Sequence, residues 1–173
     1  MAVFTRRRHA PKVRGDHTEF RPFVREDFSE GCAYCLLHEL LAGGPRNFEL
    51  DHFRPKSLPR FAALIADFFN LYYACHVCNA NKWNHWPSVE EEAIGIGFID
   101  FCRDDFSNHF RESGNGRWIP LTPSAEFTLD VLNLNCAHLV EIRARLRRIA
   151  RQRKAKPINW NQPTKSQIAI LLG

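Results

Sequence analysis

The stretch Cys75-His-Val-Cys-Asn-Ala-Asn-Lys82 decides the fold, because its two cysteines can join those of an earlier stretch, Cys32-Ala-Tyr-Cys35. A third stretch, Glu49-Leu-Asp-His-Phe-Arg-Pro-Lys56, lies between the two. In each Cys-x-x-Cys pair a tight turn can aim two thiolates at one point, so two pairs can surround a zinc ion as a tetrahedron. Four protein ligands leave no open coordination position, which is typical of a structural zinc site. Buried free thiols and redox chemistry are the alternatives. The expected zinc ligands are Cys32, Cys35, Cys75 and Cys78.

The composition is that of an ordinary globular chain. Of 173 residues, 45% are hydrophobic and 25% are charged, which is typical of folded domains rather than disordered ones. No apolar run reaches the roughly 18 residues that span a bilayer, and the first residues lack the apolar segment of a signal peptide. We therefore expect a cytoplasmic protein that does not bind membranes. In that compartment cysteines are more often thiols or metal ligands than disulfides.

The central motifs fall on two strands and a helix. Residues 48–53 alternate in polarity, which predicts a strand that stops before Pro55. Residues 71–75 form a second strand, because two tyrosines favour extended backbone. Residues 76–86 then form a helix that ends at Pro87. The pattern predicts a compact ββα unit within an α+β fold.

The rest of the chain is expected to surround this unit in a single domain. Residues 1–16 carry five basic residues and no apolar period, which indicates a basic N-terminal arm, with a solvated, disordered terminus as the alternative. Residues 17–121 hold the core, and residues 122–173 form a helical extension packed on it. Further elements are expected as helices at 20–30, 36–41, 61–68, 124–134, 136–154 and 164–172, a strand at 97–101, and a hairpin turning at Gly114-Asn-Gly116.

Four polar residues offer the groups that hydrolysis of a phosphodiester requires. A base must deprotonate water, and His52 has an imidazole with an unperturbed pKa near 6.5. A hard divalent cation can stabilise the charge on the departing oxygen, and the oxygens of Asp51 and Asn79 suit Mg²⁺ or Mn²⁺. Asn70 can hold the loop of His52 by hydrogen bonds. Surface and turn roles for these residues are the alternatives.

This combination resembles the HNH (ββα-metal) endonuclease family. The resemblance rests on Asp51-His52, then Asn70, then Asn79, all set between Cys-x-x-Cys pairs. It is strongest with a zinc-stabilised bacterial branch of the family. The matching motifs cover about residues 32–87, and a weaker similarity extends to about residue 150.

The resemblance implies a fold and a set of roles. The fold is a ββα-metal core held by zinc, with helical N-terminal and C-terminal additions. Asp51 and Asn79 would bind Mg²⁺ or Mn²⁺, His52 would be the general base, and Asn70 would be the central structural asparagine. Some members carry a further histidine ligand four residues after Asn79, where this chain has Trp83.

Basic residues near the motifs predict contact with a polyanionic strand. The net charge is +5, and residues 143–156 hold eight basic residues and no acidic one, a pattern that attracts nucleic acid. A solvated charged face is the alternative. Phosphate contacts carry no sequence information, so weakly specific cleavage is expected unless a protein partner selects the target. The expected nucleic-acid-binding residues are Arg54, Lys56, Lys82, Arg143, Arg147 and Arg151.

Two functions remain open at this point. The first is a metal-dependent HNH endonuclease that hydrolyses phosphodiester bonds of nucleic acid, with DNA favoured over RNA; the resemblance suggests phage defence or a mobile element as its setting. The second is a zinc-knuckle nucleic-acid-binding module without catalysis. The four cysteines and the basic helix suit both, but a binding module has no need of Asp51, His52, Asn70 and Asn79 together.

Overall fold

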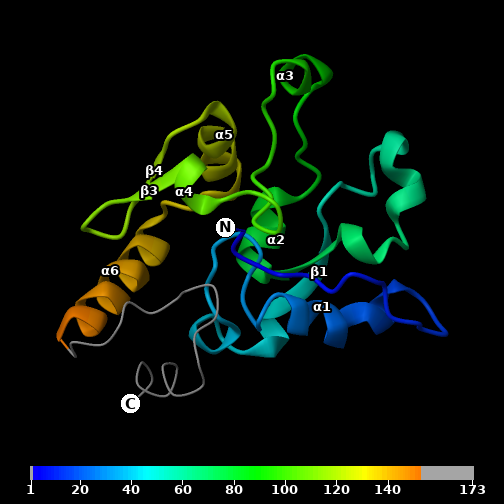
Figure 1. The fold of residues 1–173 in the computed structure, drawn as a ribbon, viewed down its shortest axis with the longest axis horizontal. Helices are drawn as coiled ribbons and strands as arrows, with labels where there is room; N and C mark the ends of the chain where they lie inside the picture. The colour runs from blue at the N-terminus through cyan, green and yellow to red at the C-terminus, as the bar shows by residue number, and fades with distance from the viewer. Residues whose placement is uncertain (1, 153–173) are drawn as a thin grey trace.

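The computed structural model describes residues 2–152 and has a mixed α+β fold with two small antiparallel sheets (Figure 1). The helix expected at 164–172 and the end of the one expected at 136–154 lie outside the described residues. The helices are α1 Arg21–Asp27, α2 His76–Lys82, α3 Val89–Ala93, α4 Phe106–His109, α5 Pro123–Leu132 and α6 Ala137–Gln152. The strands are β1 Phe48–His52, β2 Leu71–Cys75, β3 Phe110–Glu112 and β4 Trp118–Pro120. Short 3-10 helices occupy His17–Phe20, Glu39–Leu41, Pro45–Asn47, Pro59–Leu64 and Phe68–Asn70.

The first sheet is the hairpin of β1 and β2. The strands are antiparallel, with Asp51 opposite Tyr72. Because side chains alternate between the faces of a strand, Glu49 and Asp51 share one face and His52 points to the other. Helix α2 follows β2 directly, since its N-cap is Cys75. The expected order of strand, return strand and helix is therefore present.

The first part of the expected basic arm, residues 3–7, packs on the core, whereas Arg8, Lys12 and Arg14 are exposed. Val3 and Phe4 are buried, and their amides donate to the carbonyl of Phe101 at 2.8 and 3.0 Å. Arg7 pairs with the buried Asp27 at 2.8 Å. This differs from the expected basic arm, because the apolar pair ahead of the arginines belongs to the core.

Four expected elements differ in the structure. One of them, the helix expected at 76–86, ends at Lys82, before Trp83 with its positive φ of 44°. Residues 97–100 form no regular secondary structure and Phe101 begins a turn; the amide of Ile99 donates to the Thr128 hydroxyl at 2.9 Å and joins no strand ladder.

The helices expected at 36–41 and 61–68 are reduced to the 3-10 turns that begin at Glu39 and Pro59. Leu36 has a positive φ of 63°, and Asp67 has extended backbone with a ψ of 114°. A continuous helix cannot pass through either conformation.

The second hairpin, β3 and β4, turns where the glycine signal predicted it and supports α6. Gly116 has a φ of 88°, and a Cβ added there would lie 2.4 Å from the carbonyl of Val140, so only glycine allows this close approach. Arg143 of α6 is buried. It donates to the carbonyl of Gly116 at 3.3 Å and lies 4.0 Å from the ring centroid of Trp118. These contacts fix α6 against the hairpin.

A continuous cluster of buried side chains joins the two hairpins. In Figure 1, α3 lies at the tip of a loop that projects from this body, and α6 extends away from it on another side. None of the helices between residues 2 and 152 has the length and apolar character needed to cross a membrane.

Candidate metal centre and catalytic residues

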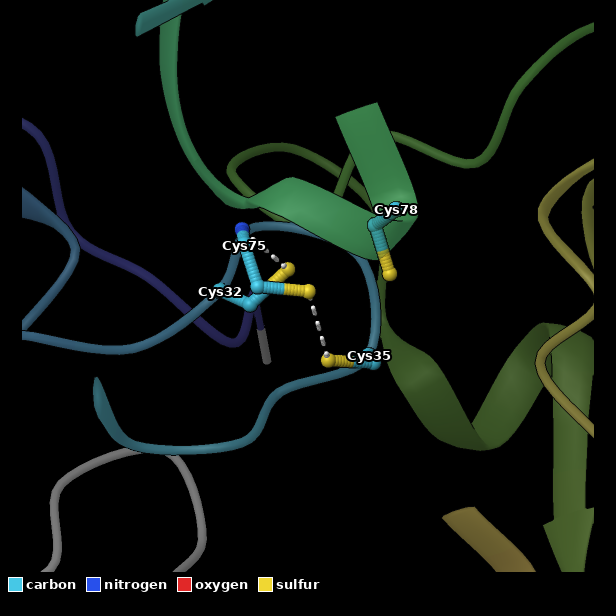
Figure 2. A group of neighbouring side chains, drawn as sticks. All are labelled: Cys32, Cys35, Cys75 and Cys78. Carbon is cyan, nitrogen blue, oxygen red and sulfur yellow. Dashed lines mark hydrogen bonds between the residues drawn. The ribbon is translucent and has the colours of Figure 1, made fainter. Parts of the chain in front are cut away.

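Two turns bring the four expected cysteines together. Cys32 and Cys35 lie on the turn after Gly31, while Cys75 ends β2 and Cys78 lies in the first turn of α2. All four are buried, and their Sγ atoms lie within 4.8 Å of one another. Figure 2 shows the sulfurs directed toward a common centre. The chain thus forms a four-cysteine cluster from segments about 40 residues apart, as the hydrogen-bonded pair of Cys35 and Cys75 shows.

The cluster has the dimensions of a tetrahedral zinc site. The Sγ atoms of Cys35 and Cys75 are 3.9 Å apart, close to the roughly 3.8 Å expected between ligands that each lie about 2.3 Å from one ion. Hydrogen bonds among the four cysteines lower the pKa of the Cys75 thiol and raise the pKa values of Cys35 and Cys78, and the bond with Cys32 has the largest effect on each. Negative charge on Cys75 is therefore stabilised by the neighbouring thiols, and a bound cation would favour the thiolate form of all four cysteines. They could bind a structural metal such as zinc.

Asp51 is enclosed by two partners from the elements beside it. The Tyr34 hydroxyl donates to Asp51 Oδ2. Lys82 Nζ lies 2.9 Å from Oδ2 and donates to Oδ1 at 3.2 Å, and it also donates to the carbonyl of His52 at 2.8 Å. The side chains of Asp51 and Lys82 are 7% and 0% exposed. An ammonium group therefore neutralises the carboxylate inside the fold.

Burial has opposite effects on the two members of this pair. It raises the pKa of Asp51 and lowers the pKa of Lys82, because each charge has lost contact with water, while their mutual attraction opposes both shifts. The expectation that Lys82 contacts phosphate is not met, since its ammonium is inside the fold. A cation on Asp51 would compete with Lys82 for the same oxygens.

His52 points to the other face of β1. Its Nε2 lies 2.9 Å from the carbonyl oxygen of Ile65, which can only accept, so Nε2 carries the proton and Nδ1 holds the lone pair. The ring centroid lies 5.2 Å from that of His17. Burial lowers the pKa of His52, although the hydrogen bond to Ile65 opposes the shift. The imidazole is therefore neutral near neutral pH and able to accept a proton.

Asn70 fixes the segment that follows His52. Its Oδ1 accepts from the backbone amide of Arg54 at 2.8 Å, and its Nδ2 donates to the Arg54 carbonyl at 3.0 Å. A third hydrogen bond reaches the carbonyl of Leu64 at 3.3 Å. Because Asn70 is buried, these bonds hold the chain in the way expected of an orienting residue.

Asn79 faces Glu49 instead of Asp51. Its Nδ2 donates to Glu49 Oε2, and Glu49 Oε1 lies 2.8 Å from His76 Nδ1. The hydrogen bond between His76 and Glu49 raises the pKa of His76 and lowers that of Glu49. The expected cation ligands are therefore separated, with Asp51 held by Lys82. The alternation of β1 could have pointed to Glu49, because it shares a face with Asp51.

The expected phosphate-binding residues are divided between the surface and the interior. Three of them are exposed: Arg54 and Lys56 in the segment after β1, and Arg151 near the end of α6. The positive surface therefore includes the segment directly after His52.

On α6 the helical period separates inner from outer arginines. Arg143 is buried, and Arg147 Nε lies 2.6 Å from Glu112 Oε1, so both serve packing in this structure. Arg145 and Arg148 are exposed and lie on the outer face with Arg151. They are better candidates for phosphate contact than Arg143, which falls within the apolar stripe of the helix.

No protein-family model matches the chain. A search of curated proteins also found no significantly similar sequence. A functional proposal therefore depends on the chemistry of these side chains: a neutral imidazole with one lone pair, exposed cationic groups beside it, and a buried carboxylate on the opposite face of the strand.

Proposed function

We propose that this chain is a metal-dependent HNH endonuclease that hydrolyses phosphodiester bonds of nucleic acid, with DNA as the favoured substrate. The observation that carries the proposal is the arrangement at the end of the β1–β2 hairpin. There the neutral His52 follows Asp51 in the chain and points to the opposite face of β1, and the buried Asn70 binds both the backbone amide and the carbonyl of Arg54. The hairpin continues into α2, which supplies part of the four-cysteine cluster.

His52 supplies the base in this proposal. Its Nδ1 accepts a proton from the attacking water, while the hydrogen bond from Nε2 to Ile65 fixes the ring. Arg54 and Lys56 are exposed directly after His52, and they would hold the phosphate backbone near the base. Because these contacts depend on the phosphate charge and not on the base sequence, cleavage is weakly specific unless a partner protein selects the target.

The divalent cation is a separate part of the proposal. When bound, Mg²⁺ or Mn²⁺ would polarise the phosphate and stabilise the leaving oxygen. Asp51 and Glu49, with Asn79 bound to Glu49, offer oxygen ligands for it, but they lie on the face of β1 opposite to His52, and Asp51 becomes available only if Lys82 moves away. Action of the cation and of His52 on one phosphate therefore requires a rearrangement of the Asp51–Lys82 pair. The zinc ion belongs to the cysteine cluster, and a reducing compartment such as the cytoplasm would keep its thiols available.

The enclosed Asp51 also favours a second candidate, a zinc-knuckle module that binds nucleic acid without cleaving it. In that case the Asp51–Lys82 pair is purely structural. The four-cysteine cluster and the exposed arginines would serve this function equally well.

A nicking assay separates the two candidates. The purified zinc-containing protein is incubated with supercoiled plasmid in EDTA, and then with added Mg²⁺ or Mn²⁺. The nuclease proposal predicts nicking that EDTA stops and either ion restores. DNA binding without nicking under every metal condition would contradict it and support the binding module. A phage-plating assay of cells with and without the protein tests the proposed setting in defence.

A further inference from the structure

A cavity of about 240 Å³ adjoins the segment that follows His52. Aromatic rings form one side of it. Phe53 and Tyr72 stack with centroids 4.6 Å apart, Trp86 meets Phe53 edge-on at 5.6 Å, and Phe98 lies 5.9 Å from Trp86. The cavity is smaller than the roughly 300 Å³ at which pockets for drug-sized ligands begin. It therefore suits one small, flat ring system.

Carboxylates line another part of the same cavity. Asp67 accepts from the amide of Phe69 at 2.9 Å, and Asp104 Oδ2 accepts from the amide of Asp100 at 2.8 Å. Each of these two bonds uses one oxygen of the side chain. The second oxygen of each group can accept a further hydrogen bond. The cavity thus combines aromatic side chains with acceptors that would attract N–H donors.

Cationic groups stand at the edge of the cavity. Arg54 and Arg103 both line it and are exposed, and the side chain of Arg103 is 71% exposed. A second cavity of about 420 Å³ shares Phe69, Tyr72 and Arg103 with the first. Arg103 Nε also lies 3.5 Å from Asp100 Oδ2. Arg54 and Arg103 thus supply exposed cationic groups beside the carboxylates of the lining, where they can meet the phosphates of a strand whose base enters the cavity.

We propose that this pocket binds one unpaired nucleobase of the nucleic-acid strand, and that it prefers guanine. Aromatic side chains stack on any base, but carboxylates accept only from donors. Guanine offers its ring N–H and its amino group side by side on one edge, whereas thymine offers a single N–H between two acceptors. A carboxylate can accept both guanine donors at once, and it would repel the oxygens of thymine.

The location connects the pocket with the chemistry. The amide of Phe53 donates to the carbonyl of Asn70 at 2.9 Å, and Phe53 follows His52 directly. A base held against Phe53 would place its own phosphate beside Arg54. This inference rests on the proposed nuclease function and sharpens it, because the substrate becomes a single strand or a duplex with an unpaired base, and not a fully paired duplex.

The test measures binding without cleavage. Full-length His52→Ala protein with its zinc content verified is titrated with fluorescent oligothymidylates that carry guanine, inosine or thymine at one central position. All strands have the same number of phosphates, so their electrostatic attraction is equal. We expect the guanine strand to bind about tenfold more tightly than the thymine strand, in line with the value of a bidentate contact to a base. Inosine, which lacks the amino group, should fall between them.

Two variants and a matched control locate the effect. Asp104→Asn and Asp67→Asn keep an oxygen for the backbone amide but lose the paired acceptors, so each should reduce the preference for guanine. Asp130→Asn removes the same charge from an exposed position on α5 and should leave the preference unchanged. Equal binding of all three strands, or a preference that survives both pocket variants, would overturn the pocket. The same series in RNA should show the same base preference, and the absolute affinities of matched DNA and RNA strands then show which sugar binds more tightly.

The pocket and the nuclease can fail separately. If wild-type protein cleaves no strand under any metal condition but the His52→Ala protein keeps its preference for guanine, the nuclease proposal is wrong and the pocket stands. If wild-type protein cleaves strands at equal rates and its affinities show no base preference, the pocket is wrong and the nuclease stands.

Discussion

The four-cysteine cluster and the Asp51–Lys82 pair are both buried groups of charge, but they are neutralised in different ways. In the cluster, four sulfurs face one another within 4.8 Å. In the pair, a carboxylate faces an ammonium at 2.9 Å. The cluster could be neutralised by a cation from outside the chain, whereas the pair carries its own. We therefore expect a metal at the cluster to stabilise the fold, and a metal at Asp51 to have to displace Lys82.

The largest expected effect is the loss of one zinc ligand. Cys75→Ser should abolish zinc binding and unfold most of the core, because structural zinc contributes about 10–16 kcal/mol in zinc-finger peptides. Zinc content and circular dichroism measure this. Cys102→Ser is the matched control, since Cys102 lies outside the cluster, and it should keep both zinc and fold. A folded, zinc-free Cys75→Ser protein would remove the structural role of the metal.

The second test concerns the pair that carries its own cation. Lys82→Met should lower the free energy of unfolding by about 3–5 kcal/mol, because it leaves the Asp51 carboxylate buried without a partner. The double variant Lys82→Met/Asp51→Asn should recover much of this loss, since no isolated charge remains. Urea denaturation measures both variants against wild type. Equal stability of Lys82→Met and wild type would show that the pair is not closed in solution.

A third buried charge, Glu39, extends the comparison to pH. Two groups donate hydrogen bonds to the Glu39 carboxylate: Arg25 Nε at 2.9 Å and the Tyr73 hydroxyl at 2.7 Å. Burial alone would raise the pKa of Glu39, but these hydrogen bonds outweigh it and lower the pKa. A carboxyl with a lowered folded-state pKa stabilises the protein above its unfolded-state pKa, and that stability is lost as pH falls through the folded-state value.

The urea midpoint of the wild-type protein should therefore decrease as the pH is lowered from about 5 to about 3, around and below the ordinary pKa of glutamate. In Glu39→Gln the midpoint should be lower at neutral pH and should change less over this range. An identical pH dependence of both proteins would contradict the assignment.

The smallest expected effect concerns the outer face of α6. Arg148→Gln should leave stability unchanged and reduce the slope of log affinity against log salt by about 1, as for the loss of a single phosphate contact. Arg143→Gln should instead lower stability, because Arg143 is buried against Trp118. Salt titrations of DNA binding and thermal denaturation of both variants measure these effects. The reverse pattern would show that the two faces are assigned wrongly.

Local patterns predicted much of the central unit. Alternation in 48–53 and the tyrosines of 71–75 gave the β1–β2 hairpin, and the spacing of the two Cys-x-x-Cys pairs gave the cluster. These signals are local, because they depend on neighbours in the chain. The glycine signal of the second hairpin worked for the same reason.

Other features depend on contacts between distant segments, which no local pattern encodes. Lys82 reads as a surface residue at the end of a short helix, and only its contact with Asp51 explains its burial. Val3 and Phe4 precede a basic run, and only the carbonyl of Phe101 explains why they join the core. The position of Arg143, by contrast, was available from the helical period of its apolar neighbours.

The most direct test of the nuclease proposal is the rate of plasmid nicking by His52→Ala in Mg²⁺ or Mn²⁺, beside His85→Ala, which alters an exposed histidine after α2. The proposal predicts that His52→Ala keeps its zinc and its fold but nicks at least about a hundredfold more slowly, as expected for loss of a general base. His85→Ala should retain the wild-type rate. Nicking by His52→Ala at the wild-type rate would contradict the proposal.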